Sequence, residues 1–359
     1  MTDYSAPFEV KAMCAPGPSE PFVPHTVTRR ACGPHDVVID VKFAGICHSD
    51  IHQVRNEWGP ATFPMVPGHE VGGKVVAVGS EVTKFKVGDS AGVGCMVDSC
   101  RDCNNCGMGE EQYCTEGMVG TYNSKFKYAH HAEQGSNTYG GYSKGIVIDD
   151  KYCLKIPDNL DLAAATPLLC AGVTVWSPMM HYGLTPQMKF AVVGLGGLGH
   201  MAVKFGVGFG CHTTVISRGT AKKEGALGEL GADAYLDSKD PEAMAAAAGS
   251  LDFILCTVSA DYEANSYLSL LNHDGKFIVV GAPSSDRPVS FFMVLLKRIQ
   301  LGGSLIGGIR QTQEMLDFCG RKNIVCDIET IAADKIDEAY NKTVAGDVKY
   351  RFVIDCDTI

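Results

Sequence analysis

Four cysteines stand close together in one short segment of the chain. Cys100, Cys103, Cys106 and Cys114 follow the spacing C-x2-C-x2-C-x7-C. Four thiolates in so short a segment can close a tetrahedral shell around Zn²⁺, and an all-thiolate shell leaves no open position for a substrate. Such a metal stabilises a lobe that lacks a hydrophobic core of its own. The spacing therefore predicts a structural zinc site; disulfide bonds are the alternative, and a reducing compartment disfavours them.

A second kind of metal site requires ligands from several parts of the chain. A catalytic zinc takes three protein ligands and keeps a fourth position open. Cys47 in GICHSD, His69 in GHE and Cys170 in PLLCAG are candidates. They lie far apart in the sequence, so spacing alone does not bring them together. An isolated cysteine of this kind is more often a small core residue, and the three remain candidates on the residues alone.

A glycine-rich run could bind phosphates. Gly194, Leu195, Gly196, Gly197, Leu198 and Gly199 form the pattern G-x-G-x-x-G. The apolar run 190–193 directly before it predicts a buried strand, and a helical stretch follows. In this setting the first glycine permits a tight turn, the second lets the backbone approach a pyrophosphate, and the third allows close packing of helix on strand. The motif predicts a dinucleotide site; the alternative is an ordinary glycine-rich turn.

The end of the next predicted strand indicates which dinucleotide binds. An NAD site carries an acid there for the ribose 2′-hydroxyl. Here the strand 213–216 is followed by Ser217 and Arg218, then by Lys222 and Lys223, and no carboxylate occurs before Glu224. A hydroxyl and three cations suit a 2′-phosphate, although basic residues also occur at solvated helix starts. We therefore expect NADP(H).

The chain divides into two regions with different predicted secondary structure. Up to about residue 157 the chain is rich in Gly, Val and turn residues, with strands expected at 37–43 and 73–78 and loops over 95–141. A helix is expected over 161–184. Beyond it the predicted strands are 190–193, 213–217, 252–257 and 276–280, and the helices between and after them open near residues 198, 222, 262 and 290. This alternation predicts βαβ units and a doubly wound parallel sheet, and the fold class is α/β.

Composition narrows the classes of function. The chain has 359 residues, of which 45% are hydrophobic and 20% charged, so it can bury a sizeable core. A formal net charge of −10 disfavours nucleic acid or an anionic membrane as a partner. The N-terminus lacks a signal-peptide pattern, and glycines interrupt the most apolar window, 189–210. Fifteen cysteines without such a signal indicate a reducing compartment, by default the cytoplasm.

Longer stretches resemble one known family. They are GICHSDIH, PGHEVGG, KVGD, the four-cysteine segment, PLLCAGVTVWSP, GLGGLGH, ISRGTAKKEGAL, VVGAP and IGGIRQTQEMLDFC. Together they closely resemble the zinc-containing medium-chain dehydrogenase/reductase superfamily, and within it the cinnamyl alcohol dehydrogenase-like aldehyde reductases. The resemblance implies a GroES-like β-rich catalytic domain, residues 1–160 completed by 305–359. It also implies a Rossmann NADP-binding domain, residues 161–304, with the active site in the cleft.

The same resemblance implies roles for individual residues. Cys47, His69 and Cys170 would hold the catalytic zinc, and Glu70 would be a neighbouring carboxylate that exchanges with water on the metal. Ser49 and His52 would form a proton relay through the cofactor ribose, with Glu57 behind the histidine. The residues expected to contact the cofactor are Ser49, Thr174, the run from Gly194 to Gly199, Ser217, Arg218, Lys222, Thr257, Gly281, Ser304, Leu305 and Ile306.

The expected function is hydride transfer between NADP(H) and aldehydes or primary alcohols, with zinc at both sites. Gly120 stands where plant lignin-pathway members carry tryptophan, so aromatic (cinnamyl-type) and aliphatic aldehydes are both expected. Trp58 could wall the substrate pocket; the alternative is a half-buried lid residue. Alternatives are a reductase of iminium or activated C=C bonds, a non-catalytic NADPH-binding or crystallin-like protein, and a zinc-finger-type interaction module.

Two expectations concern surfaces. The family usually forms homodimers through edge strands of the Rossmann sheet, which places a homodimer contact near residues 290–305. The segment 125–137, which contains His130 and His131, is expected to be a mobile loop with solvated histidines. Neither histidine is included in the predicted metal sites.

Overall fold

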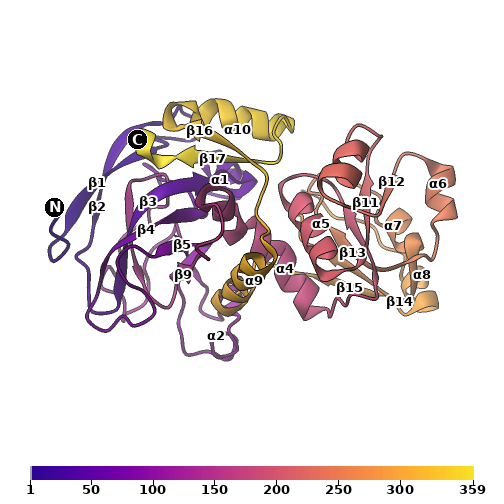
Figure 1. Cartoon of the computed structure of the whole chain (residues 1–359), viewed down its shortest axis with the longest axis horizontal. Coiled ribbons are helices and arrows are strands. Elements are labelled where there is room, and N and C mark those ends of the chain that lie inside the picture. The colour runs from indigo at the N-terminus through magenta and orange to yellow at the C-terminus, as the bar shows by residue number, and fades with distance from the viewer. Residues whose placement is uncertain (1, 284) are drawn as a thin grey trace. The chain divides into compact units, whose positions relative to one another are not determined.

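The computed structural model describes residues 2–283 and 285–359, and Figure 1 shows its helices and strands. The chain forms two compact units. The first unit comprises Met1–Cys170 and Gly307–Ile359, and the second is Ala171–Ile306. Each unit has its own sheet, and each carries a different part of the predicted chemistry.

The first unit is built around a mainly antiparallel sheet whose strand order is β16-β17-β3-β4-β5-β9, with β8 also paired to β3. The bounds are β3 Asp36–Gly45, β4 Val71–Val78, β5 Ser90–Val93, β8 Gly145–Asp149, β9 Leu154–Lys155, β16 Ile328–Ala332 and β17 Arg351–Asp355. Strand β17 pairs with β3 antiparallel, with Val353 opposite Gly45. The C-terminal tail therefore completes a sheet that the N-terminal part begins, and it brings Arg351 beside the start of α1.

Smaller elements surround this sheet. Two ribbons pair β1 Phe8–Cys14 with β2 Val23–Arg29, and β6 Met96–Asp98 with β7 Val119–Gly120. The helical elements of the unit are α1 His48–Val54, α2 Asn104–Gly107, η1 Glu111–Tyr113, α3 Leu162–Ala165, η2 Thr166–Leu169, α9 Ile309–Lys322, η4 Ala333–Lys335, α10 Ile336–Ala345 and η5 Cys356–Thr358.

The second unit is a parallel sheet flanked by helices. Its strand order is β12-β11-β10-β13-β14-β15, and every neighbouring pair is parallel. The strands are β10 Lys189–Val193, β11 His212–Ser217, β12 Ala234–Asp237, β13 Leu251–Cys256, β14 Leu271–Val279 and β15 Gln300–Gly303; the helical elements are α4 Ala171–His181, α5 Gly197–Phe209, η3 Gly225–Glu229, α6 Pro241–Ala246, α7 Ala264–Leu270 and α8 Phe291–Lys297. The order reverses between β10 and β13, which is the switch point where such sheets bind ligands.

The predicted α/β class, with a β-rich unit and a doubly wound parallel unit, is confirmed. The apolar runs that predicted strands are nearly fully buried; Phe190, Val192 and Ile254 are 0% exposed. Runs of this kind belong in a parallel sheet that is covered on both faces.

One helix prediction was wrong in detail. The helix expected over 161–184 is broken into α3, η2 and α4, and Cys170 lies at the break with φ −124° and ψ −65°. Pro167 within the run prevents one continuous ladder of hydrogen bonds. The helix expected to open near residue 222 is present: it begins at residue 223 and continues as the short η3.

Among the described residues, no single helix has the length and hydropathy to cross a membrane. One bent pair, Leu162–Leu169 with Ala171–His181, meets the same test of length and composition.

Candidate functional site

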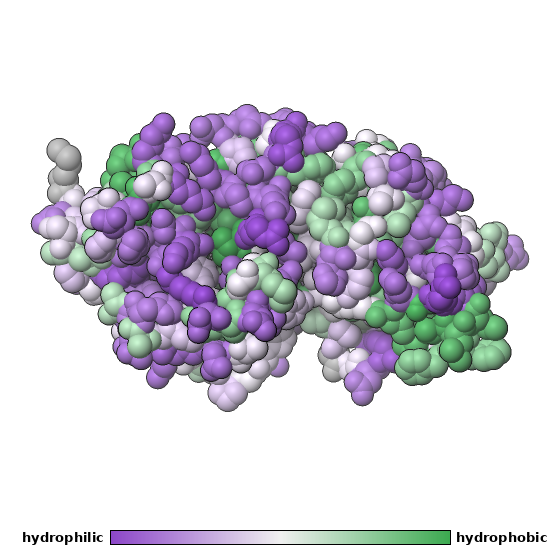
Figure 2. Space-filling model, turned by 90° about the horizontal axis from the view of Figure 1, so that it is seen from below, coloured by the Kyte–Doolittle hydropathy of each residue, from purple (hydrophilic) through white to green (hydrophobic). Residues whose placement is uncertain are grey.

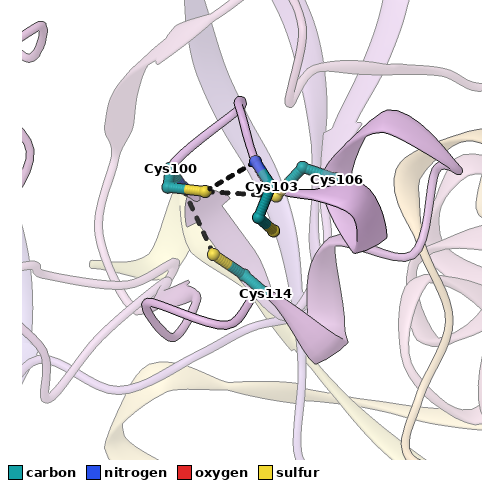
Figure 3. Close-up of side chains that lie close together, drawn as sticks. All are labelled: Cys100, Cys103, Cys106 and Cys114. Atoms are coloured by element: carbon teal, nitrogen blue, oxygen red, sulfur yellow. Dashed lines mark hydrogen bonds between the residues drawn. The ribbon is translucent and has the colours of Figure 1, made fainter.

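The four cysteines of the C-x2-C-x2-C-x7-C segment converge on one point. Their sulfur atoms all lie within 4.8 Å of one another, and Figure 3 shows them facing a common centre. The backbone N–H of Cys103 donates to Cys100 Sγ at 3.3 Å, and that of Cys100 donates to Cys114 Sγ at 3.4 Å. Arg101, at φ 64°, turns the chain between the first two cysteines. Such N–H···S bonds favour thiolates, and four thiolates fit a closed zinc shell.

Electrostatics inside this cluster, which we call the cysteine lobe (residues 100–114), point the same way. Backbone N–H groups of Cys106 and Thr115 lower the pKa of Cys103 to about 5. Burial raises the pKa of Cys106 to about 12, although Ser99 hydrogen-bonds its sulfur at 3.1 Å. A metal that takes all four sulfurs would therefore displace protons from some of them and find one already ionised.

The residues Cys47, His69, Glu70 and Cys170 form a second cluster, which we call the buried cluster. One potential ligand atom from each lies within 4.8 Å of the others. His69 Nε2 is 3.2 Å from Cys170 Sγ, although the two residues are 101 positions apart in the sequence. Cys47 stands at the N-cap of α1, His69 and Glu70 directly precede β4, and Cys170 lies at the break before α4. Two sulfurs and one imidazole nitrogen at one point are the donor set of a catalytic zinc.

The thiols of the buried cluster share protons unequally. The hydrogen bond with Cys170 holds the pKa of Cys47 well below its usual range, and the same contact raises the pKa of Cys170 well above it. The contact therefore favours the thiolate at Cys47 and the protonated thiol at Cys170. Zinc binding needs both as thiolates, so loading the metal releases a proton.

Asp50 fixes the geometry of two members of the buried cluster. Its Oδ2 accepts the backbone N–H of Cys47 at 2.9 Å, which closes the capping box of α1. Its Oδ1 lies 3.1 Å from His69 Nδ1 and accepts the backbone N–H of Gly68. A proton held on Nδ1 leaves Nε2 free to bind a metal. Asp50 lies in the GICHSD segment, but no sequence pattern marked it as a site residue.

Glu70 is held by a residue that no sequence signal indicated. Arg351 of β17 forms a buried ion pair with Glu70 Oε1, although the two are 281 residues apart. The second oxygen, Oε2, is buried and has no hydrogen-bond partner among the described residues. Burial raises the pKa of Glu70 to about 7 against the opposing charge of Arg351. A carboxylate oxygen kept free in this way could reach a metal.

Gly45 leaves the space that the Glu70 carboxylate occupies. A Cβ built at this position would lie 1.8 Å from Glu70 Oε2. Any other residue would have to push the carboxylate away or shift β3. The requirement for glycine here is therefore steric, and it belongs to the buried cluster rather than to a turn.

Ser49 and His52 lie on α1, next to the buried cluster. Ser49 Oγ is 3.7 Å from Cys47 Sγ. His52 Nδ1 is 2.5 Å from Glu57 Oε2, and its ring stacks on Trp58 with centroids 4.8 Å apart. With Nδ1 bonded to the carboxylate, Nε2 can give and take a proton. The structure thus places Glu57 behind His52, as the resemblance implied.

In the second unit, the glycine run follows β10 at the switch point of the sheet. Gly194 has φ 91°, and Gly196 is the N-cap of α5. A Cβ on Gly199 would lie 2.1 Å from the carbonyl oxygen of Gly194, so helix and strand pack as closely as the motif requires. Thr257, which follows β13, donates to the carbonyl oxygen of Val193 at 2.9 Å and borders the same turn. The N-terminal N–H groups of α5 are free to bind phosphate.

Ser217 and Arg218 end β11 beside this turn. Lys222 reaches back, and its Nζ donates to the carbonyl oxygen of Leu195 at 2.7 Å. Burial lowers the pKa of Lys222, and the charge of Arg218 lowers it further. Two cations and a hydroxyl therefore gather next to the glycine run, as expected for a 2′-phosphate site.

The other predicted cofactor residues are scattered over the second unit. Thr174 lies on α4, and its hydroxyl is buried without a hydrogen-bond partner in residues 2–283 and 285–359. Gly281 packs against Val258, whose carbonyl oxygen would be 2.3 Å from a Cβ there. Ser304 donates its backbone N–H to the carbonyl oxygen of Val279, while Leu305 is half exposed. Ile306 has φ 40° at the end of the unit.

The expectation of solvated histidines in the 125–137 loop holds for His130, which is exposed, and was wrong for His131. His131 is buried, and its ring stacks on Phe126 with centroids 3.7 Å apart. His130 Nε2 lies 3.0 Å from a carboxylate oxygen of buried Asp98, and Tyr128 Oη lies 3.6 Å from Cys114 Sγ. The aromatic stack therefore packs the loop on itself, and the contacts with Asp98 and Cys114 join it to the cysteine lobe and its neighbouring strand. Residue spacing gave no sign of these contacts.

Comparison with known proteins agrees with this geometry. Residues 33–158 match the model of the alcohol dehydrogenase GroES-like domain, and residues 197–321 match that of the zinc-binding dehydrogenases. The NADP-dependent alcohol dehydrogenase C 1 of Mycolicibacterium smegmatis is 53% identical over 347 residues, which cover 96% of this chain and 97% of that protein. The chain therefore belongs to the zinc-binding alcohol dehydrogenases.

Solved structures place it more narrowly in that family. A cinnamyl alcohol dehydrogenase from Sorghum bicolor superposes with a TM-score of 0.92 at 45% identity, covering 98% of both chains. A cinnamyl alcohol dehydrogenase from Helicobacter pylori, solved with NADP(H), gives a TM-score of 0.87 at 39% identity, covering 98% of this chain and 99% of that one. The predicted family, fold class and zinc-type alcohol dehydrogenase activity are confirmed.

Proposed function

We propose that this enzyme transfers hydride between NADP(H) and a broad range of aldehydes and primary alcohols, aromatic (cinnamyl-type) as well as aliphatic. The buried cluster carries the proposal, because two sulfurs, one imidazole and a free carboxylate oxygen meet beside Ser49. Bound zinc supplies Lewis-acid polarisation of the carbonyl, and NADPH supplies the hydride. The Mycolicibacterium relative is named for NADP, and the two solved relatives for cinnamyl alcohol.

Each residue near the zinc would have a separate task. Cys47, His69 and Cys170 would hold the metal, and Asp50 would keep His69 in the tautomer that exposes Nε2. Glu70 would approach the metal when water or product leaves. The four sulfurs of the cysteine lobe would hold a second, structural zinc.

Ser49 and His52 would move the proton that alcohol formation requires. The Ser49 hydroxyl donates it, and His52 replaces it from solvent through Nε2, because Glu57 occupies Nδ1. Trp58, which is 54% exposed, would cover the outer face of the relay histidine. A Cβ at Gly120 would lie 3.3 Å from the carbonyl oxygen of Tyr122, whose ring stacks on His69, so a larger residue at position 120 would narrow the site for bulky aldehydes.

The test is NADPH oxidation with benzaldehyde, cinnamaldehyde and aliphatic aldehydes, with and without a zinc chelator, and again with NADH. We expect turnover across the panel, a strong preference for NADPH and loss of activity in chelator. Ser49→Ala should abolish most turnover while Ser49→Thr, which keeps the hydroxyl, should retain much of it. Chelator-insensitive turnover, or reduction of iminium substrates but no aldehydes, would contradict the proposal.

We also propose that the enzyme is a homodimer in a reducing compartment such as the cytoplasm. All fifteen cysteines are free of disulfide bonds. Helix α8 exposes Phe291, Phe292, Leu295 and Leu296, each by more than 65%, beside β15, which ends the strand order of its sheet. Figure 2 shows a hydrophobic area at the right-hand end of the molecule, where Figure 1 places α8. A face of this kind fits a second copy of the same face.

Sedimentation of Leu295→Glu/Leu296→Glu tests this assignment. We expect the wild type to sediment as a dimer and this variant as a monomer. Val344→Glu, which alters an apolar residue that is 53% exposed on α10, is the control and should remain dimeric. A monomeric wild type would refute the proposed dimer.

A further inference from the structure

The short turn after β11 carries the residues that distinguish NADP(H) from NAD(H). It runs from Ser217 through Arg218 and Gly219, and Gly219 has φ 68°. A turn with a left-handed glycine is conformationally free unless neighbouring groups hold it. The direction of the Arg218 guanidinium therefore depends on what fixes the Gly219 peptide.

Asp237, at the end of the edge strand β12, holds the peptide group that precedes Gly219. The parallel pairing of β11 and β12 places Asp237 opposite Ser217. Its Oδ1 accepts the backbone N–H of Gly219 at 2.7 Å and that of Lys239 at 2.9 Å. The acid nearest to the predicted 2′-phosphate site is thus bonded to backbone N–H groups of the protein itself.

Tyr235 holds the peptide group that follows Gly219. Its hydroxyl donates to the carbonyl oxygen of Gly219 at 2.7 Å. Burial raises the pKa of this phenol, and a hydrogen bond with the Ser217 side chain offsets part of the rise. The backbone N–H of Ser238 also donates to the carbonyl oxygen of Ser217 at 2.9 Å. Both polar groups of Gly219 are therefore fixed by one strand, β12.

The held turn brings two positive charges close together. Lys222 is tied to the carbonyl oxygen of Leu195; burial lowers its pKa, and the charge of Arg218 lowers it further. Two cations held near each other repel, and a dianionic phosphate between them would relieve that repulsion. If the turn were loose, Arg218 could move into solvent and the site would lose its preference for the phosphate.

We propose that Tyr235 and Asp237 are positioning residues for cofactor selection. They fix the two peptide groups that flank Gly219 and so keep Arg218 where the 2′-phosphate binds. This inference rests on the proposed use of NADP(H). Neither side chain needs to touch the cofactor. Their effect should therefore appear in the discrimination between 2′-phosphorylated and unphosphorylated ligands, and not in the chemistry.

Calorimetry on the full-length zinc enzyme tests this positioning role, which we call the lock. It measures the binding of 2′,5′-ADP and of 5′-AMP. Asp237→Ala should weaken 2′,5′-ADP about tenfold, the order expected from losing one or two hydrogen bonds, while 5′-AMP changes less than about twofold. Asp237→Asn keeps an acceptor oxygen and should stay within about threefold of the wild type. Tyr235→Phe should resemble Asp237→Ala in direction with a smaller effect.

Asp233→Ala is the matched control. Asp233 precedes the same strand and accepts the backbone N–H of Thr213 at 2.7 Å, at the opposite end of β11. It should leave the ratio of the two affinities unchanged even if it lowers the melting temperature. Equal weakening of both ligands in Asp237→Ala, or tighter 2′,5′-ADP binding after loss of the acid, would overturn the lock.

The wild type separates this inference from the function on which it rests. If the wild type binds 2′,5′-ADP no more tightly than 5′-AMP, the proposed use of NADP(H) fails and the lock fails with it. If the wild type shows the preference and both Asp237→Ala and Tyr235→Phe retain it, only the lock is wrong.

Discussion

The cysteine lobe and the buried cluster both offer sulfur ligands at one point, but they are assembled in opposite ways. The lobe takes its four ligands from residues 100–114, and three of them are partly exposed. The buried cluster takes its ligands from three distant segments and depends on Arg351 from the C-terminal tail. A local site needs only its own loop, whereas a dispersed one forms only after the sheet of the first unit has closed. The proposed chemistry thus lies at the site whose ligands come from distant segments.

Removing one sulfur of the buried cluster should give the largest effect. Cys47→Ser should lower kcat/KM for benzaldehyde by about a thousandfold or more, because Lewis-acid stabilisation of the transition state is lost. Metal analysis should find one zinc fewer than in the wild type, with the zinc of the lobe retained. Cys211→Ser alters a buried thiol of the second unit and should leave turnover unchanged. Undiminished turnover in Cys47→Ser would remove the buried cluster from catalysis.

The second-largest effect is expected from removing Arg351, the residue of the C-terminal tail that pairs with Glu70. Arg351→Met leaves the Glu70 carboxylate buried without its partner and should lower the free energy of unfolding by about 3–5 kcal/mol in urea titrations. Adding Glu70→Gln removes the unpaired charge and should restore part of the loss. If Arg351→Met is as stable as the wild type, the ion pair is not what ties the tail to the buried cluster.

A matching change in the cysteine lobe should affect stability more than chemistry. Cys103→Ser should release the zinc of the lobe and raise proteolysis within residues 100–114 by roughly tenfold, because little apolar packing holds this segment. Turnover per remaining zinc should stay within about threefold of the wild type. A collapse of turnover in folded protein would show that the two sites are not separate.

The smallest expected effect concerns the aromatic loop beside the lobe. Tyr128→Phe removes the hydroxyl that donates to the carbonyl oxygen of Gly117 and lies 3.6 Å from Cys114 Sγ, and it should speed zinc release from the lobe about threefold. Release from the buried cluster, followed in the same experiment with a chromogenic chelator, should not change. Equally faster zinc release from both sites would indicate a general destabilisation of the first unit instead.

The same contrast explains what could be predicted from sequence. The cysteine spacing and the glycine run carry their geometry in adjacent residues, so the lobe and the turn after β10 could be located directly. Cys47, His69 and Cys170 could be grouped only through the family resemblance. Arg351 and Tyr235 each hold a residue on another strand or loop, and Asp50 holds His69, which lies 19 positions away; no local pattern marks these contacts. The break at Cys170 was missed because helical propensity does not report where a chain must turn to present a ligand.

Gly45 has a consequence for how this family of sequences can diverge. Because a Cβ there would collide with Glu70, even alanine should be excluded as long as the carboxylate is kept. Gly107 in the cysteine lobe has no atom within 4 Å of such a Cβ and no left-handed backbone, so it is free to vary. In a saturation library, tolerance at position 45 should return only in clones that have also shortened the side chain at position 70. Positions 45 and 70 would then covary, because together they set the spacing between β3 and the loop before β4.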